Sequence, residues 1–202
     1  LLINDNELRS KITPHGLNAV IAKGEDKGKS ALFFLAANSE GQQLLKDDEV
    51  LRGKITAIGL NAVMAIGEHK GISALWLLAK GAIGQQLLRE NAELQGKITA
   101  QGLNSVIASG QYIGKSALWY LARSPEGRKL LKDDAVLRSK ITDKALNAVA
   151  AKGLLKGCSA LMFLAGDPIG QQLLKDDAVL RGKVNAKGLN TVIAEGQFKG
   201  YS

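Results

Sequence analysis

The chain has 202 residues, with 27 Lys and Arg against 19 Asp and Glu, so its formal net charge is +8. Apolar residues make up 46% of it, which excludes a disordered tail, and its single cysteine excludes a disulfide framework and a cysteine-rich metal site. No apolar run approaches the roughly 18 residues that a membrane span needs. Because nothing here needs an oxidising compartment, we expect a reducing one, such as the cytoplasm.

The sequence repeats itself at a fixed spacing of 43 residues, without insertion or deletion. Complete repeats occupy 8–50, 51–93, 94–136 and 137–179, between partial repeats at 1–7 and 180–202. Such periodicity indicates a solenoid, in which stacked neighbours bury their apolar faces jointly. We therefore expect one repeat domain over residues 1–202. Because both ends fall inside a repeat, we also expect a piece of a longer array.

The first helix of each repeat has a clear start signal. Thr13 is a typical N-cap, and Pro14 suits the first helical position, where its missing N–H costs nothing. Leu17, Val20 and Ile21 follow at the spacing of one helix face. The pattern predicts a helix that starts at Pro14 and continues past Ile21.

A loop and a second helix come next. Gly24 and Gly28 bracket the loop, at positions that favour backbone with positive φ. Ser30 is the expected N-cap of the second helix, which places Leu32 and Leu35 on one face.

The remainder of the repeat predicts a third and a fourth helix. The third start is clearest at Ser124-Pro125, an N-cap followed by a first-turn proline. A single helix over 41–55 would turn Asp48 toward the core, so we favour a break there, with Asp48 capping a short fourth helix through Leu51 and Ile55. A strand at 54–57 is the weaker alternative. The sequence thus predicts an all-α fold, a right-handed α-solenoid with three to four short helices per repeat.

Several columns hold the same residue in every repeat. The Leu17 and Val20 columns are expected in the core, and so are the column that begins at Phe33 and its neighbour at Phe34, although stacking platforms for bases are an alternative. The asparagine column, at positions 18, 61, 104, 147 and 190, is unusual because asparagine is unfavourable inside a helix. We expect it to form a ladder of bonds to loop backbone, and a row of ligand-facing amides is the alternative.

Other columns vary, and they cluster in the loop and just before the serine cap. A constant scaffold with variable loops is typical of a recognition surface, although neutral drift of solvated loops would look similar. A second variable patch follows the second helix, at 37–39, 80–82, 123–125 and 166–168. The loops around 25–29, 68–72, 111–115 and 154–158 are expected to bind a protein partner. The candidate contact residues are Glu25, Asp26, Lys27, Lys29, Glu68, His69, Lys70, Gln111, Tyr112, Lys115, Leu154, Leu155 and Lys156.

Nothing in the sequence predicts an enzyme. Catalysis needs a unique constellation of nucleophile, base and orienting group, whereas most polar residues here recur in each repeat or vary in loops. His15 and His69 occupy different columns, and Cys158 is one of five residues found in its variable column. Aspartate pairs such as Asp47-Asp48 lack the spacing of a calcium loop and suit helix capping better. We therefore expect no catalytic residue, no metal, no cofactor and no small-molecule substrate.

Binding to nucleic acid, DNA in particular, is the main alternative function. The stretch from Lys27 to Ser30 combines a cation, a glycine and a helix start, and lysine recurs at Lys70, Lys156 and Lys199. A regular row of cations with a net positive charge can follow a nucleic-acid backbone or an acidic membrane surface. A solvated charged face is the plainer interpretation.

Parts of the repeat resemble known repeat families. The segment from Gly71 to Ala79 resembles the T-P-L-H-x-A core of ankyrin repeats, without their proline and histidine and with a longer period. This likeness implies protein binding. The stretch from Ile12 to Leu32 resembles the repeats of transcription-activator-like effectors, with Thr13-Pro14, a Glu25-Asp26 loop and a Gly-Lys-Ser-Ala-Leu helix start. In that family the loop pair reads DNA bases, which Leu154-Leu155 could not do by hydrogen bonding. Long arrays of nearly identical units also resemble secreted effectors of intracellular bacteria, which would imply delivery into a host cell.

Overall fold

The computed structural model describes residues 5–65 and 70–189, and this part of the chain is all-helical. Between those limits the only extended pairing assigned is an isolated antiparallel bridge from Val149 to Ser159. The chain divides into two compact units, Leu1–Gly102 and Leu103–Ser202, which are described separately.

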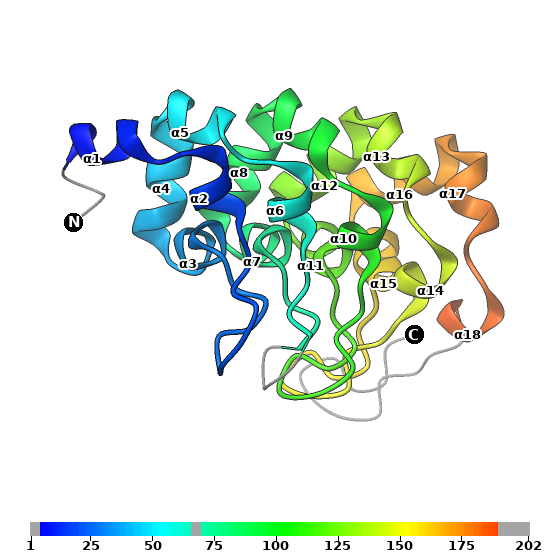
Figure 1. Ribbon diagram of the computed structural model, residues 1–202. Coiled ribbons are helices and arrows are strands. Elements are labelled where there is room, and N and C mark those ends of the chain that lie inside the picture. Colours follow the sequence, from blue (N-terminus) through cyan, green and yellow to red (C-terminus); the bar gives the residue numbers. More distant parts are fainter. Residues whose placement is uncertain (1–4, 66–69, 190–202) are drawn as a thin grey trace. The chain divides into compact units, whose positions relative to one another are not determined.

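Unit 1 is a set of short helices, most of them joined by only a few residues, with a longer loop after α2 and after α6. Its helices are α1 (Asn6–Lys11), α2 (Pro14–Asn18), α3 (Ala31–Ala36), α4 (Ser39–Asp47), α5 (Glu49–Gly53), α6 (Ala57–Asn61), α7 (Ala74–Lys80), α8 (Ala82–Glu90) and α9 (Ala92–Lys97), and α10 (Ala100–Asn104) spans the boundary. Helices that correspond in sequence contact each other: α3 packs on α7, and α4 on α8 (Figure 1). α1 likewise lies against α5, and α2 against α6.

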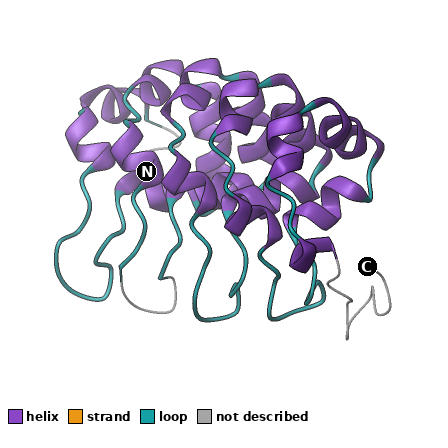
Figure 2. Ribbon diagram, turned by 90° about the vertical axis from the view of Figure 1, so that its right-hand side faces the viewer, coloured by secondary structure: helices purple, strands orange, loops and turns teal. Residues whose placement is uncertain are grey.

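Unit 2 has the same arrangement. Its helices are α11 (Ala117–Arg123), α12 (Pro125–Asp133), α13 (Ala135–Ser139), α14 (Asp143–Asn147), α15 (Ala160–Ala165), α16 (Pro168–Asp176), α17 (Ala178–Gly182) and α18 (Ala186–Leu189). α11 packs on α15, α12 on α16, α13 on α17 and α14 on α18. In each unit the loops leave the helices on one side (Figure 2). Loop residues next to the helices, such as Met64, Ile107 and Cys158, are buried with the core, whereas Glu25, Gln111 and Leu154 farther along their loops are exposed.

The predicted helix starts are confirmed. Thr13 accepts from the N–H of Gly16, and Ser30 accepts from that of Phe33. Ser124 caps α12 with Pro125 at its first position. The predicted break is also confirmed, because Asp48 adopts an extended conformation and caps α5. This finding rules out both a single helix over 41–55 and a strand at 54–57.

The predicted end of the first helix is wrong. α2 stops at Asn18, so this residue lies at the end of the helix, whereas the sequence pattern suggested a position in its middle. The Asn18 side chain bonds the backbone of α2 and of the next repeat, and the chain then turns extended at Ala19. Val20 and Ile21 consequently lie in the loop, 45% and 40% exposed, and do not join the core.

The second helix buries the predicted column at Phe33, Trp76 and Trp119, whereas Met162 in the same column is half-buried. Trp76 and Trp119 are each 1% exposed, and Phe33 is buried beside them in the same column.

The neighbouring column is buried only in part: Tyr120 is 5% exposed, Leu77 and Phe163 are half-buried, and Phe34 is 46% exposed, which corrects the prediction for that residue. Adjacent residues on a helix point about 100° apart, so Phe34 lies on a different side of α3 from the buried Phe33.

Candidate binding surface on the loops

Each candidate loop is anchored at its base by the asparagine column. Asn18 donates from Nδ2 to the carbonyls of Pro14 (2.6 Å) and Lys54 (2.7 Å), and its Oδ1 accepts from the N–H of Thr56 (2.9 Å). The last two partners belong to the next repeat. This side chain therefore ends its own helix and ties it to the following one.

The same three bonds recur elsewhere in the column. Asn61 bonds Ala57, Lys97 and Thr99 at 2.7, 2.8 and 3.0 Å. Asn147 repeats the pattern in unit 2, with bonds of 2.7 and 2.9 Å from Nδ2 and one of 3.4 Å to Oδ1. The predicted ladder is confirmed, because the side-chain amides of Asn61 and Asn147 donate to and accept from backbone groups of their own and the next repeat.

The backbone of each loop is closed by main-chain bonds alone. We name the loops by number: loop 1 is 19–29, loop 2 is 62–72, loop 3 is 105–115 and loop 4 is 148–158. In loop 1 the N–H of Ile21 donates to Lys29, and the N–H of Gly28 donates back to Ile21, both at 2.8 Å. Equivalent pairs join Met64 to Ile72 and Gly71, and they recur in loops 3 and 4.

The bracketing glycines have the positive φ that the sequence predicted, +83° at Gly24 and +93° at Gly28. They also let neighbouring loops approach closely. A Cβ on Gly28 would come within 3.0 Å of the Met64 Cα, and one on Gly114 would overlap the Val149 carbonyl oxygen. In unit 2 the N–H of Ala151 also donates to Ile113 (3.0 Å), which joins loop 4 to loop 3.

Loop 1 presents a charged tip. Glu25, Asp26 and Lys27 are exposed, as a contact surface requires. Lys29 is half-buried, because its Nζ lies 2.5 Å from Asp26 Oδ1 and 5.5 Å from the centre of the Phe34 ring. The tip of this loop is thus polar and partly neutralised by its own ion pair.

In loop 2, the candidate residues Glu68 and His69 lie outside the residues that the structure describes. Lys70 is exposed at the end of the gap. Met64, two residues before the gap begins, is 2% exposed. The described part of loop 2 therefore offers Lys70 as its candidate contact.

Loop 3 supplies an aromatic and a cation over a buried tryptophan. Gln111 is exposed, while Tyr112 and Lys115 are half-buried. Lys115 Nζ lies 5.7 Å from the Tyr112 ring centre and 5.0 Å from that of Trp119, and the Arg123 guanidinium is 5.8 Å from the Trp119 ring. Such cation–π contacts fix the two cations at the surface. Arg123 belongs to the second variable patch, which we had not included among the contact residues.

Loop 4 has the most apolar tip among those described. Leu154 is 79% exposed, and Leu155 and Lys156 are half-buried. Lys152, which sequence reasoning missed, is exposed on the other side of the tip. Lys152 lies just before Gly153, whereas the candidate contacts were taken from the variable residues after it. The only signal in the sequence is that the residue before this glycine differs between repeats.

Cys158 closes loop 4 but faces inward. It is 1% exposed, and its carbonyl accepts a bond from Trp119 Nε1 (2.9 Å). Burial raises the pKa of the Cys158 thiol and keeps it protonated at neutral pH. The cysteine therefore serves as a small packing residue beside Trp119.

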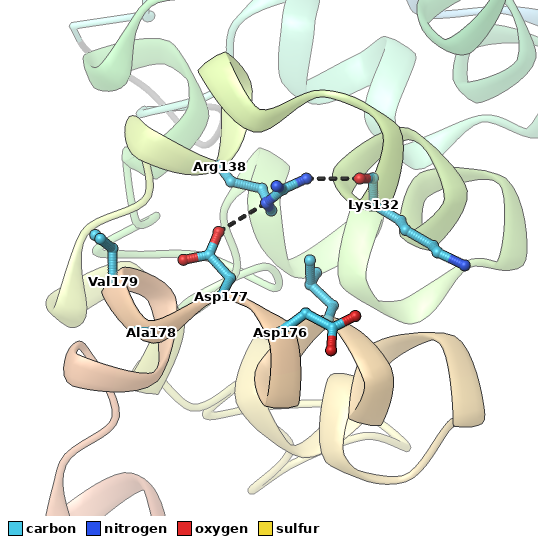
Figure 3. Close-up of a pocket in the computed structure, with 7 residues that line it drawn as sticks. Lys132, Arg138, Asp176, Asp177, Ala178 and Val179 are labelled. Carbon is cyan, nitrogen blue, oxygen red and sulfur yellow. Dashed lines mark hydrogen bonds and ion pairs between the residues drawn. The ribbon is translucent and has the colours of Figure 1, made fainter.

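A cavity of about 330 Å³ lies on the helical side of unit 2, between α12–α13 and α16–α17. Figure 3 shows Arg138 Nε donating to Asp177 (2.8 Å) and its Nη1 donating to the Lys132 carbonyl (2.6 Å). Asp177 also caps α17, and the backbone N–H of Leu180, followed by Arg138, lowers the pKa of this carboxyl. The side chains of Arg138 and Asp177 are hydrogen-bonded to each other and to backbone groups. We therefore interpret the cavity as a space between packed helices.

The aspartate pairs act as helix caps, as predicted. Asp48, Asp134 and Asp177 accept from the N–H groups of Leu51, Leu137 and Leu180, each at 2.8 Å. Among residues 5–65 and 70–189 no group of three or more His, Cys, Asp or Glu could hold a metal ion. None of the described helices has the length and apolar character to cross a membrane.

Comparisons of the chain with protein-family models, with curated proteins and with solved structures found no match.

Proposed function

We propose that the chain is a stretch of a right-handed α-solenoid of 43-residue repeats, and that it acts as a non-enzymatic scaffold that binds a protein partner through loops 1 to 4. Within this proposal the array is ankyrin-like and of the kind found in effectors of intracellular bacteria. Its site of action is then a reducing compartment, such as the interior of a host cell.

The observation that carries the proposal is that the loops have the same backbone hydrogen bonds but different side chains at their tips. The backbone bonds that close loops 1, 3 and 4 are equivalent, yet their tips read Glu25-Asp26, Gln111-Tyr112 and Leu154-Leu155. A constant frame with different side chains at one position can read different features of a partner. The asparagine ladder supports this, because it places successive loops at bonded intervals within each unit.

A permutation of loop tips tests this function without changing composition or net charge. The variant carries Glu25→Leu, Asp26→Leu, Leu154→Glu and Leu155→Asp, and the closing bonds involve none of these side chains. A photo-crosslinking residue at Gln111 first identifies the partner, and Val136, which is 66% exposed on α13, provides the control position. We expect the purified partner to bind the native chain and to lose at least tenfold in affinity for the permuted chain. Unchanged affinity at unchanged stability would refute recognition through the tips.

Nucleic-acid binding is the second candidate, and the charge of loops 3 and 4 favours it. These loops contain Lys115, Lys152 and Lys156 and no acidic residue. Duplex DNA and RNA are titrated at two salt concentrations, since phosphate contacts make affinity fall steeply with salt. Binding with a steep slope would support this candidate, and no binding at low salt would remove it. The permutation should weaken such binding as well, because it places two carboxylates between Lys152 and Lys156 of loop 4, so the salt dependence is what distinguishes the two candidates.

A further inference from the structure

We propose that the tip of loop 4, defined as residues 152–156, docks on anionic lipid surfaces by inserting Leu154 between headgroups while the flanking lysines contact them. This surface contact is an activity beyond recognition of a protein partner. The exposure of the tip, its flanking charge, its support by loop 3 and the contrast with loop 1 carry the inference.

The first observation is the exposure of Leu154. It is one of the two most exposed large apolar side chains among the described residues, at 79%, and Leu155 beside it is half-buried. The loops of each unit project from the helices on one side (Figure 2), and the exposure of Leu154 places its side chain in solvent. A fluid headgroup layer can receive such a tip without a preformed pocket, and burial of the side chain there is favourable.

The second observation is the charge around the tip. Lys152 and Lys156 flank the two leucines, and neither loop 4 nor loop 3 contains an acidic residue. Lysine can keep its ammonium group at headgroup level while its methylene chain lies alongside apolar neighbours. Each lysine near an anionic leaflet strengthens binding roughly fivefold.

The third observation is the support from loop 3. The bond from Ala151 N–H to the Ile113 carbonyl (3.0 Å) joins the two loops next to the tip. Loop 3 brings a half-buried Tyr112, a residue type favoured at membrane interfaces, and Lys115 stacked near its ring. Loop 3 therefore places an aromatic side chain and a further lysine next to the loop 4 tip.

Loop 1 provides the contrast. It has the same closing bonds, but Glu25 and Asp26 stand where Leu154 and Leu155 stand in loop 4. Carboxylates at the tip would be repelled by an anionic surface. The docking capacity is therefore specific to the loop 4 tip and is not a property of the repeat.

The test is co-sedimentation of the full chain with vesicles of pure phosphatidylcholine and with vesicles rich in phosphatidylserine, at low and high salt. We expect binding to the phosphatidylserine vesicles only, weakened by salt. Leu154→Ser should reduce it roughly tenfold without changing net charge, and Lys152→Gln roughly fivefold. Ile58→Ser is the matched control, because Ile58 is also 79% exposed but belongs to helix α6 and not to a loop.

A second measurement reports insertion directly. In a Leu154→Trp variant, tryptophan emission should shift to shorter wavelength with phosphatidylserine vesicles and remain unchanged with phosphatidylcholine. The proposal is overturned if the vesicles fail to bind at low salt. It is equally overturned if Lys152→Gln weakens binding while Leu154→Ser does not, since that would be plain charge attraction by a basic chain. Leucine dependence found with a protein partner but not with vesicles would assign the tip to a pocket on that protein.

Discussion

The same junction between successive repeats is closed by different chemistry in unit 1 and in unit 2. In unit 1, Gln42 donates to the Ala36 carbonyl (2.8 Å) and accepts from the N–H of Gly84 (2.9 Å). In unit 2 the corresponding residue is Arg128, which bonds the Ala122 carbonyl (3.0 Å) and forms an ion pair with Asp167 (2.9 Å).

The difference shows that junction residues change in matched pairs. Asp167 corresponds in sequence to Gly81, where a Cβ would overlap the Gln42 amide. An amide therefore pairs with a glycine in one unit, and a guanidinium with a carboxylate in the other. The loop tips differ while the closing bonds use main-chain groups only. At the junction, loss of Asp167 would leave Arg128 without its ion pair, and a side chain at position 81 would overlap Gln42.

We expect the largest loss of stability from removing the asparagine bonds, which join successive repeats in both units. Asn61→Ala in unit 1 and Asn147→Ala in unit 2 each remove three bonds to backbone, two of them to the next repeat. We expect each to lower the free energy of unfolding by about 3 kcal/mol, since buried backbone groups lose their partners. Urea unfolding measures this loss. A much smaller loss in one unit would show that the ladder is not equivalent in the two.

The next effect isolates the chemistry that differs. Arg128→Ala removes the carbonyl bonds and leaves the half-buried Asp167 without its cation, so we expect a loss of about 2 kcal/mol. Arg128→Gln with Asp167→Gly recreates the unit 1 pair. A double-mutant cycle should give a favourable coupling of about 1 kcal/mol. Additive losses would mean that the two residues changed independently.

A smaller effect depends on pH. The backbone N–H of Leu51, and then Arg9, lower the pKa of Asp48, and the pKa of Asp177 is lowered in the same way by Leu180 and Arg138. The stability that these carboxylates contribute is present above their unfolded pKa of about 3.9 and is lost as the pH falls through their folded pKa.

Asp177→Asn tests this sign. Asparagine keeps the cap, as Asn91 does at α9 (2.8 Å), and loses the charge together with the bond that Asp177 accepts from Arg138 Nε. We expect a loss of about 0.5 kcal/mol at neutral pH and none in strong acid, measured by thermal unfolding across the acid range. A constant difference at every pH would contradict a role for the charge.

The smallest effect belongs to the loop tips. Glu25→Ser and Leu154→Ser should each change the free energy of unfolding by less than about 0.5 kcal/mol, because both side chains are exposed. Urea unfolding, run beside the junction variants, provides the measurement. A loss comparable to that of Arg128→Ala would remove the distinction between free tips and paired junctions.

Much of this architecture could be predicted from the sequence. The caps at Thr13, Ser30 and Asp48 combine a residue type with a position, and this combination is strictly local. The ladder was predictable because asparagine recurs where a helix former would otherwise be favoured.

The errors have a common cause, which is that facing partners lie about one repeat apart. The end of α2 at Asn18 depends on the Lys54 carbonyl, and the exposure of Phe34 depends on which side of α3 meets its neighbour. The pairing of Arg128 with Asp167 is visible in the sequence only as two unrelated departures from their columns. Lys152 was missed for a different reason, because it lies before Gly153 and outside the variable triplet from which the candidate contacts were taken.

The main-chain closure of the loops has a consequence for how such a chain can diversify. The bonds that close loop 1 join main-chain groups of Ile21, Gly28 and Lys29, so side chains between the two glycines can change without breaking them. New tips are then reachable one nucleotide at a time, through intermediates that selection need not reject. An array of this design could acquire a new binding preference by drift alone, and a protein engineer could follow the same route deliberately.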